Sequence, residues 1–270
     1  MARIIEVENL DCEGLRPYRI TSEIQLKRWF EPEKTGIFIA ESPKVIRLAL
    51  NADYEPISLL AERKYITGQA SDITERCGDI PLYTAESHVL TAITGFKLTQ
   101  GILCAMRRKK LPSVSEICGK SQRIAVLENV MNQTNIGAVI RSATALGFEG
   151  VLLTPECSDP LYRRAVRVSM GNVFKMPFAY FENNNYISEL KSYGFTTVAM
   201  ALHGNTLDID SPVFKNLEKI ALFFGTEGEG LKEETIEKCD YTAKIPMMNG
   251  VDSLNVASAS AVAFWELRKN

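Results

Sequence analysis

Strands that are apolar at every position are the feature that most constrains the fold of this chain. The stretches 198–202 (VAMAL) and 221–224 (ALFF) contain no polar side chain. A strand with one face in water alternates apolar and polar residues, so strands like these are typical of a parallel sheet covered by helices on both faces. From Arg123 onward such strands alternate with helical patterns, which predicts an α/β fold with a mostly parallel sheet.

The predicted elements of this part follow one another in regular alternation. Apolar residues at helical spacing indicate a helix over 136–146, with Asn135 as its N-cap and Gly147 as its stop. The other expected helices cover 160–169, 185–193, 232–239 and a final stretch that ends at Leu267, and strands are expected at 124–130, 150–154, 172–178, 196–202, 219–225 and 241–247.

Residues 1–106 form another region of short mixed strands and helices. The basic, Pro-containing stretch 107–122 then breaks the alternation, as an interdomain linker does. The sequence therefore predicts a small α/β domain over 1–106, a linker over 107–122 and a larger α/β domain over 123–270.

Composition excludes several classes of protein. The chain has 270 residues, of which 46% are hydrophobic and 24% are charged, as in ordinary soluble domains. No apolar run reaches the roughly 18–20 residues that a membrane helix needs, and the first residues lack the apolar core of a secretory signal. We therefore expect a cytoplasmic protein without a membrane segment. The six cysteines and two histidines have no zinc or dithiol spacing, so no metal site is expected.

The net charge of −2 argues against a protein that coats nucleic acid without specificity. A local basic patch remains at Arg163, Arg164 and Arg167. Arg163 and Arg167 share one face of the expected helix, which an anion such as RNA phosphate can approach. A solvated charged helix face is the alternative interpretation of these arginines.

Polar residues gather in three loops that follow predicted strands, where open α/β sheets bind their ligands. The loops hold Asn129, Asn132 and Asn135 before a helix that carries Arg141, then GTEGEG at 225–230, then Asp252, Ser253 and Asn255 before the final helix. One small polar residue is enough to cap a helix, so the surplus indicates a site. The alternatives are that these residues only cap helices and that the glycine-rich stretch is only a tight turn.

The glycine-rich stretch does not match a dinucleotide-binding loop. Its glycines at 225, 228 and 230 give G-x-x-G-x-G, whereas the pyrophosphate turn needs G-x-G-x-x-G after the first strand of a domain. Its glycines still allow the backbone to approach a ligand closely.

Together, NQTNIGAVIRSATALG (132–147), FFGTEGEGL (223–231) and IPMMNGVDSLNVASASA (245–261) resemble the three motifs of the SpoU (TrmH-type) RNA 2′-O-ribose methyltransferases of the SPOUT class. Order and spacing match over 123–270. Residues 1–106 are similar, less specifically, to an L30e-like substrate-binding domain through GIFIAESPKVIRLAL, with Ser42 where family members commonly have Gly.

The resemblance implies a C-terminal trefoil knot whose loops bind S-adenosylmethionine, with Gly225, Ile245 and Leu254 lining the cofactor pocket. The acceptor nucleotide would be surrounded by Asn135, Arg141, Glu227, Ser253 and Asn255. An arginine gives up its proton reluctantly, so the role we expect for Arg141 is to pair with a phosphate and polarise the hydroxyl.

The resemblance also implies the partners. It points to a homodimer and to 2′-O-methylation of structured RNA, with ribosomal RNA preferred over transfer RNA because of the L30e-like extension. The final helix is apolar almost all round, which fits packing against a second subunit as well as a fully internal helix. A catalytically silent RNA-binding protein and a SPOUT enzyme that methylates a base nitrogen are the alternative functions.

Overall fold

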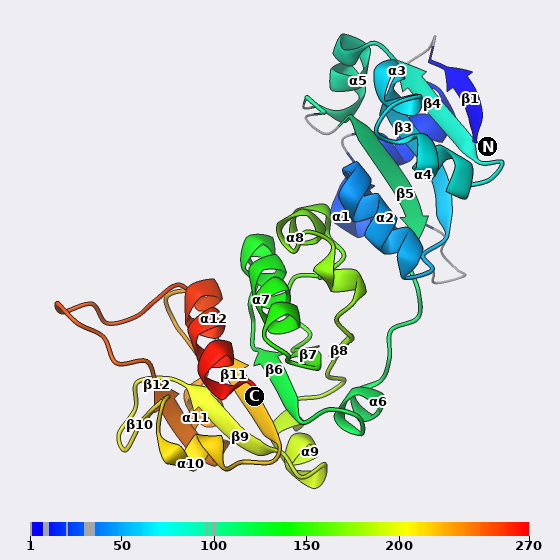
Figure 1. The fold of residues 1–270 in the computed structure, drawn as a ribbon. Coiled ribbons are helices and arrows are strands. Elements are labelled where there is room, and N and C mark those ends of the chain that lie inside the picture. The colour runs from blue at the N-terminus through cyan, green and yellow to red at the C-terminus, as the bar shows by residue number, and fades with distance from the viewer. Residues whose placement is uncertain are drawn as a thin grey trace. The chain divides into compact units, whose positions relative to one another are not determined.

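The computed structural model describes residues 2–7, 11–19, 21–29, 36–95, 97–98 and 101–269 (Figure 1). The chain forms two compact units, one made of Met1–Lys110 and Leu161–Phe174 and the other of Leu111–Pro160 and Lys175–Asn270. The chain therefore passes between the units at three points rather than through a single linker.

The first unit is built on a five-stranded mixed sheet in the order β1-β4-β3-β5-β2, in which β4 pairs in parallel with β1 and β3 while β5 is antiparallel to β3 and β2. Its strands are β1 (Arg3–Glu6), β2 (Ile37–Glu41), β3 (Pro56–Glu62), β4 (Pro81–Ala85) and β5 (Ile102–Arg107). Its helices are η1 (Glu13–Tyr18), α1 (Glu23–Lys27), α2 (Pro43–Asn51), α3 (Arg63–Ile66), α4 (Ser71–Arg76), α5 (Ser87–Thr94), α8 (Arg163–Val168) and η2 (Asn172–Phe174).

The second unit is built on a seven-stranded sheet in the order β10-β12-β9-β11-β6-β7-β8, and every neighbouring pair in it is parallel. Its strands are β6 (Arg123–Leu127), β7 (Gly150–Leu153), β8 (Phe178–Tyr180), β9 (Thr196–Met200), β10 (Leu207–Asp208), β11 (Ile220–Phe224) and β12 (Tyr241–Lys244). Its helices are α6 (Val114–Cys118), α7 (Gln133–Ala145), α9 (Tyr186–Ser192), α10 (Pro212–Lys215), α11 (Glu233–Lys238) and α12 (Val256–Leu267).

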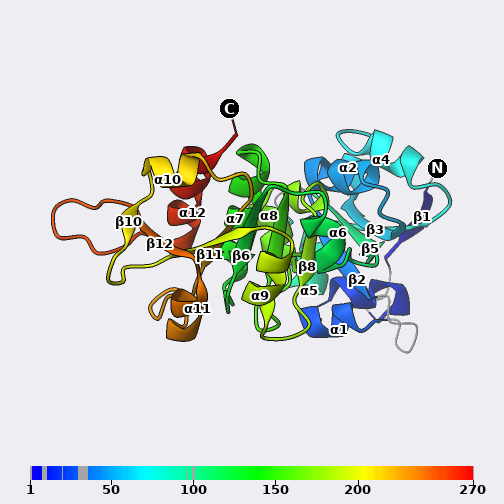
Figure 2. The same ribbon diagram turned by 90° about the horizontal axis from the view of Figure 1, so that it is seen from below.

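Helices cover both faces of this sheet, as the apolar strands predict. Figure 2 shows α7 and α12 on one side and α9 and α11 on the other. On the α9 side, Val126 and Phe223 belong to a buried cluster that includes residues of α6 and α9. On the opposite side, the Phe264 ring of α12 packs edge-on against Phe224, with ring centroids 5.5 Å apart. The predicted α/β class with a mostly parallel sheet is confirmed.

The predicted strand over 172–178 is wrong in its first half. Residues 172–174 form the short helix η2, and β8 begins only at Phe178. The Phe174 ring packs against Phe38 and Tyr54 of the first unit, with centroids 5.5 Å and 5.1 Å away. Tertiary packing therefore overrides the apolar pattern that indicated a strand.

The division of the chain also differs from the expected boundaries. The stretch 107–122, expected to be a linker, contains α6, which begins at a capping box between Ser113 and Glu116 and buries Ile117. Residues 161–174, expected in the larger domain, pack with the first unit instead. Among the described residues, the structure contains no helix that is both long and apolar enough to span a membrane.

Candidate functional site

A cavity of about 610 Å³ lies at the carboxyl ends of three adjacent strands of the second unit, β12, β9 and β11. Its wall is formed mainly by residues 200–202, 224–231, 243–245 and 252–256. Its volume lies within the range of roughly 300–1,000 Å³ that is usual for small-molecule sites. The carboxyl edge of a parallel sheet is where such a site is expected.

The loop between β11 and α11 (225–231) can follow its path only because of a glycine. A Cβ atom at Gly225 would lie 2.1 Å from the backbone carbonyl of Gly230, inside any tolerated contact. Thr226 and Gly230 pair through backbone hydrogen bonds of 3.0 Å and 3.2 Å, which close the turn. Gly228 and Gly230 have φ angles of 100° and 73°, which side-chain-bearing residues rarely adopt.

The three residues that the sequence assigned to the cofactor pocket all line this cavity. Gly225 follows β11, Ile245 follows β12, and Leu254 lies in the loop that leads into α12 (orange in Figure 1). Gly225 contributes backbone groups, whereas Leu254 contributes an apolar side chain that is 39% exposed. Apolar side chains together with a few backbone polar groups are the usual lining of a small-molecule site.

Three of the residues predicted around the acceptor meet in one polar cluster at the cavity, which we call the Asn135–Glu227–Asn255 cluster. The Asn135 amide donates to Glu227 Oε1 at 2.6 Å, and the Asn255 amide donates to the same oxygen. The Asn255 amide also lies 3.4 Å from Asn135 Oδ1. Residues up to 120 positions apart in the chain thus converge, as the three motifs predict.

The structure corrects which asparagine caps α7. The N-cap is Asn132, whose side chain accepts from the Thr134 backbone at 2.9 Å. Asn135 lies one turn further on and is 4% exposed, so its side chain is committed to Glu227 rather than to capping. Asn255 does both, because its Oδ1 caps α12 through the Ala257 backbone at 2.8 Å while its amide reaches Glu227.

Two predicted residues lie outside this cluster. Ser253 is exposed and lines the cavity. Arg141 is exposed on α7, six residues beyond Asn135, and is not part of the cavity wall. The cluster therefore carries a carboxylate whose partners, within the described part of the chain, are neutral amides.

The arginines expected to contact RNA divide into two kinds. Arg164 and Arg167 are exposed on α8. The Arg163 side chain is 22% exposed, and its Nε lies 3.3 Å from Glu41 Oε2, whose side chain is 6% exposed. Burial lowers the pKa of the Arg163 guanidinium. The Glu41 carboxylate thus neutralises the positive charge of Arg163 within the first unit.

Sequence reasoning missed Glu128, which directly follows β6 and is 1% exposed. An acidic residue immediately after five buried strand positions was the available signal, because a carboxylate is rarely buried without several donors. Within the described residues no cluster of three or more His, Cys, Asp or Glu side chains could hold a metal ion.

Comparisons with known proteins agree with the motifs. Residues 122–265 match the SpoU rRNA Methylase family. An uncharacterized tRNA/rRNA methyltransferase of Mycobacterium bovis is 36% identical over 237 residues, which is 87% of this chain and 82% of that protein. A protein of Bacillus subtilis named 23S rRNA (guanosine(2553)-2′-O)-methyltransferase RlmP is 27% identical over 88% of this chain and 91% of its own length.

The fold also matches a solved structure along nearly its whole length. The crystal structure of an AdoMet-bound rRNA methyltransferase from Sinorhizobium meliloti superposes with a TM-score of 0.81, at 26% identity, over 98% of this chain and 97% of that one.

Proposed function

This chain belongs to the SpoU rRNA methylase family, and we propose that it transfers a methyl group from S-adenosylmethionine to a ribose 2′-hydroxyl of structured RNA, ribosomal RNA in particular. The observation that carries the proposal is the Asn135–Glu227–Asn255 cluster at a cavity lined by Gly225, Ile245 and Leu254. The names of the relatives from B. subtilis and S. meliloti support ribosomal RNA as the substrate class.

The cavity residues fit S-adenosylmethionine. Gly225 allows the loop 225–231 to close on itself, because a side chain there would strike the Gly230 carbonyl. The closed loop lines the cavity with backbone groups that can hydrogen-bond the edge of an adenine ring. Ile245 and Leu254 offer apolar surface to the ring. The cofactor, when bound, supplies a methyl on a sulfonium that is already activated for transfer.

The cluster orients the acceptor. Glu227 fixes both amides, and its carboxylate remains able to accept a hydrogen bond from a ribose hydroxyl. Ser253 offers a hydroxyl at the same cavity. Holding the 2′-oxygen in line with the methyl group is the main requirement of the transfer.

Arg141 acts beside the cluster rather than in it. Six residues of helix advance about 9 Å from Asn135, a span that the sugar-phosphate backbone of a bound nucleotide can bridge. The Arg141 guanidinium pairs there with a phosphate and stabilises the negative charge that develops on the acceptor oxygen.

The remaining parts of the proposal concern assembly and RNA contact. We propose a homodimer that uses α12 as its interface. On this helix Trp265 is 57% exposed and Val262 is 40% exposed in the single chain, and a second subunit would cover this apolar surface. The C-terminal stretch forms a trefoil knot, and residues 1–106 act as an L30e-like RNA-binding domain. Arg164 and Arg167 contact the RNA backbone.

A methyl-transfer assay tests the function. Purified protein and labelled S-adenosylmethionine are incubated with ribosomal RNA that lacks the modification, and the RNA is digested to nucleosides. We expect label in a 2′-O-methylnucleoside. Arg141→Ala should reduce transfer at least about a hundredfold while the dissociation constant for S-adenosylmethionine changes less than about threefold.

The exposed Lys120→Ala variant is the matched control for loss of a surface charge, and it should retain activity. Label on a base nitrogen would show that the enzyme methylates a base instead of a ribose. Binding of RNA without binding of S-adenosylmethionine would identify a catalytically silent RNA-binding protein and overturn the proposal.

A further inference from the structure

Glu128 is a buried carboxylate at the root of the loop that leads from β6 to α7. Its backbone N–H donates to the Phe224 carbonyl at 2.9 Å. Its residue is 1% exposed, although an ionised carboxylate is among the most expensive groups to bury. Such a group stays in a fold only when donors compensate it.

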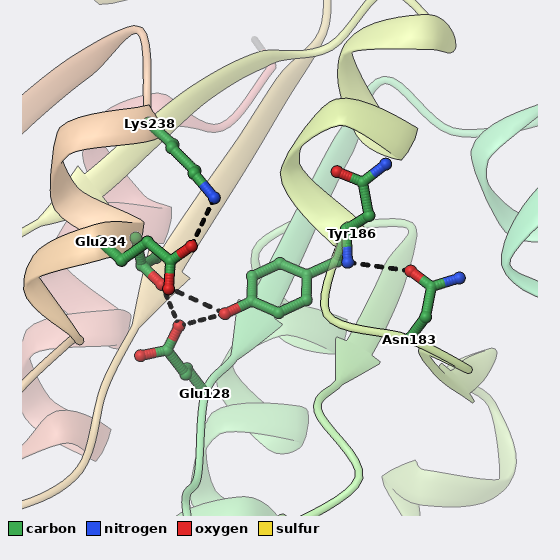
Figure 3. A network of polar contacts seen from close by, with 7 residues as sticks. Glu128, Asn183, Tyr186, Glu234 and Lys238 are labelled. Atoms are coloured by element: carbon green, nitrogen blue, oxygen red, sulfur yellow. Dashed lines mark hydrogen bonds and ion pairs between the residues drawn. The ribbon is translucent and has the colours of Figure 1, made fainter.

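Three donors from three different positions converge on the Glu128 carboxylate. Figure 3 shows the Tyr186 hydroxyl pointing at it. The Lys232 backbone N–H donates to Oε1 at 2.8 Å. Oε2 accepts from the Tyr186 hydroxyl at 2.6 Å and from Thr235 Oγ1 at 2.5 Å. Burial, together with the hydrogen bond to Glu128, raises the pKa of Tyr186, so the phenol stays protonated as a donor.

The contacts of Glu128 lie on both sides of the loop 225–231 in the sequence. Phe224 immediately precedes the loop 225–231, and Lys232 immediately follows it. One residue therefore fixes both ends of the loop that lines the cavity, through its backbone on one side and its carboxylate on the other. Thr235 extends the attachment into the first turn of α11.

The same two chain segments are joined a second time at their tips. Asn135, seven residues beyond Glu128, donates to Glu227 in the middle of the loop. The segments 128–135 and 225–232 are thus tied at the base by Glu128 and at the cavity by the Asn135–Glu227 contact. A change at the base alters the loop on which the cavity contact depends.

We propose that Glu128, with Tyr186 and Thr235, is a positioning residue that holds the loop 225–231 in the shape required to bind S-adenosylmethionine. Glu128 is not part of the cavity wall and acts through Lys232 and Phe224. The inference rests on the proposed function, because it assigns this loop to the cofactor site.

The test compares three single substitutions in the full chain. Glu128→Gln keeps the size of the side chain but replaces one acceptor oxygen with an amide that faces the two hydroxyl donors. Tyr186→Phe removes one donor only. Glu234→Gln is the matched control, because Glu234 lies on the same helix, α11, and pairs with the exposed Lys238.

Calorimetric binding of S-adenosylmethionine and steady-state kinetics provide the readout. Glu128→Gln should raise the dissociation constant and the KM for S-adenosylmethionine by about tenfold, the loss expected when a hydrogen-bonded charge is removed. The KM for RNA should change less than about twofold. Tyr186→Phe should raise the dissociation constant by about threefold, and Glu234→Gln should leave it unchanged.

The outcomes separate the inference from the proposed function. If Glu128→Gln lowers the melting temperature but leaves the affinity for S-adenosylmethionine unchanged, the network only stabilises the fold and the inference fails while the function stands. If Glu128→Gln does not fold, Tyr186→Phe decides by the same criterion. If the unaltered chain does not bind S-adenosylmethionine, the proposed function fails, and the inference fails with it.

Discussion

The Asn135–Glu227–Asn255 cluster of the second unit and the Glu41–Arg163 pair of the first unit are built in opposite ways. In the cluster, an exposed carboxylate meets two neutral amides, so its negative charge is not cancelled by the contacts that hold it. In the pair, a buried carboxylate meets a guanidinium, and the two charges cancel. Both join residues about a hundred positions apart in the sequence.

This difference distinguishes a carboxylate that can bind a ligand from one that stabilises the fold. An exposed carboxylate held by neutral donors, such as Glu227, keeps acceptor capacity and charge for a ligand. A buried ion pair has little acceptor capacity left and is costly to break. By this criterion the cavity of the second unit is prepared for a ligand, and Arg163 contributes to the stability of the first unit.

Glu227→Ala should give the largest effect, because it removes the residue that orients both amides. We expect kcat for methyl transfer to fall by about a thousandfold, the upper range for loss of one preorganised group. The dissociation constant for S-adenosylmethionine should change far less than kcat, because Glu128 still holds both ends of the loop 225–231. Single-turnover transfer to RNA is the measurement, with Glu237→Ala, exposed on α11, as the matched control. Normal turnover in Glu227→Ala would place the chemistry elsewhere.

Arg163→Met should lower the free energy of unfolding. It leaves the Glu41 carboxylate buried without its cation, which costs about 3 kcal/mol of unfolding free energy. Adding Glu41→Gln should recover most of that loss, because the orphaned charge is then gone. Denaturant unfolding of both variants measures this. Should Arg163→Met instead keep its stability and weaken RNA binding, Arg163 would join Arg164 and Arg167 as an RNA contact.

Gly225→Ala tests whether cofactor binding depends on the tight turn at the cavity. The new Cβ would lie 2.1 Å from the Gly230 carbonyl, so the loop 225–231 must shift. We expect the dissociation constant for S-adenosylmethionine to rise by about tenfold. The same substitution at Gly119, outside the loop, serves as the control. Unchanged binding in Gly225→Ala would show that the cofactor does not depend on this turn.

Patterns within a single segment were enough to predict the core of the second unit. The uninterrupted apolar runs at 124–127 and 220–224 were correctly interpreted as buried parallel strands, because side chains on both faces of such a strand pack against helices. The convergence of Asn135, Glu227 and Asn255 followed from the motif resemblance rather than from any local pattern.

What could not be predicted depends on partners distant in sequence. The helix RRAVRV looks like an exposed basic face, and only the fold reveals Glu41, 122 positions away, as the partner of Arg163. Three asparagines at a spacing of three residues made the cap of α7 ambiguous, and helix geometry selected Asn132 over Asn135. Glu128 escaped notice because its three donors come from β11–α11 and α9 rather than from neighbouring residues.

Ser42→Gly, in the first unit, should give the smallest change in stability. Ser42 has φ 88° and ψ 147°, a conformation that is essentially reserved for glycine and that costs a serine of order 1–3 kcal/mol. Its side chain caps α2 through the Val45 backbone at 3.3 Å, and replacing a serine cap by glycine costs only a few tenths of a kcal/mol. Glycine also loses more backbone entropy on folding, by roughly 0.5–1 kcal/mol. Taken at the centres of these ranges, the sum favours Ser42→Gly by about 1 kcal/mol, measurable as a higher denaturant midpoint with an unchanged slope. A lower midpoint would mean that the cap and the lower backbone entropy of serine outweigh the strain, and that Ser42 stabilises the first unit.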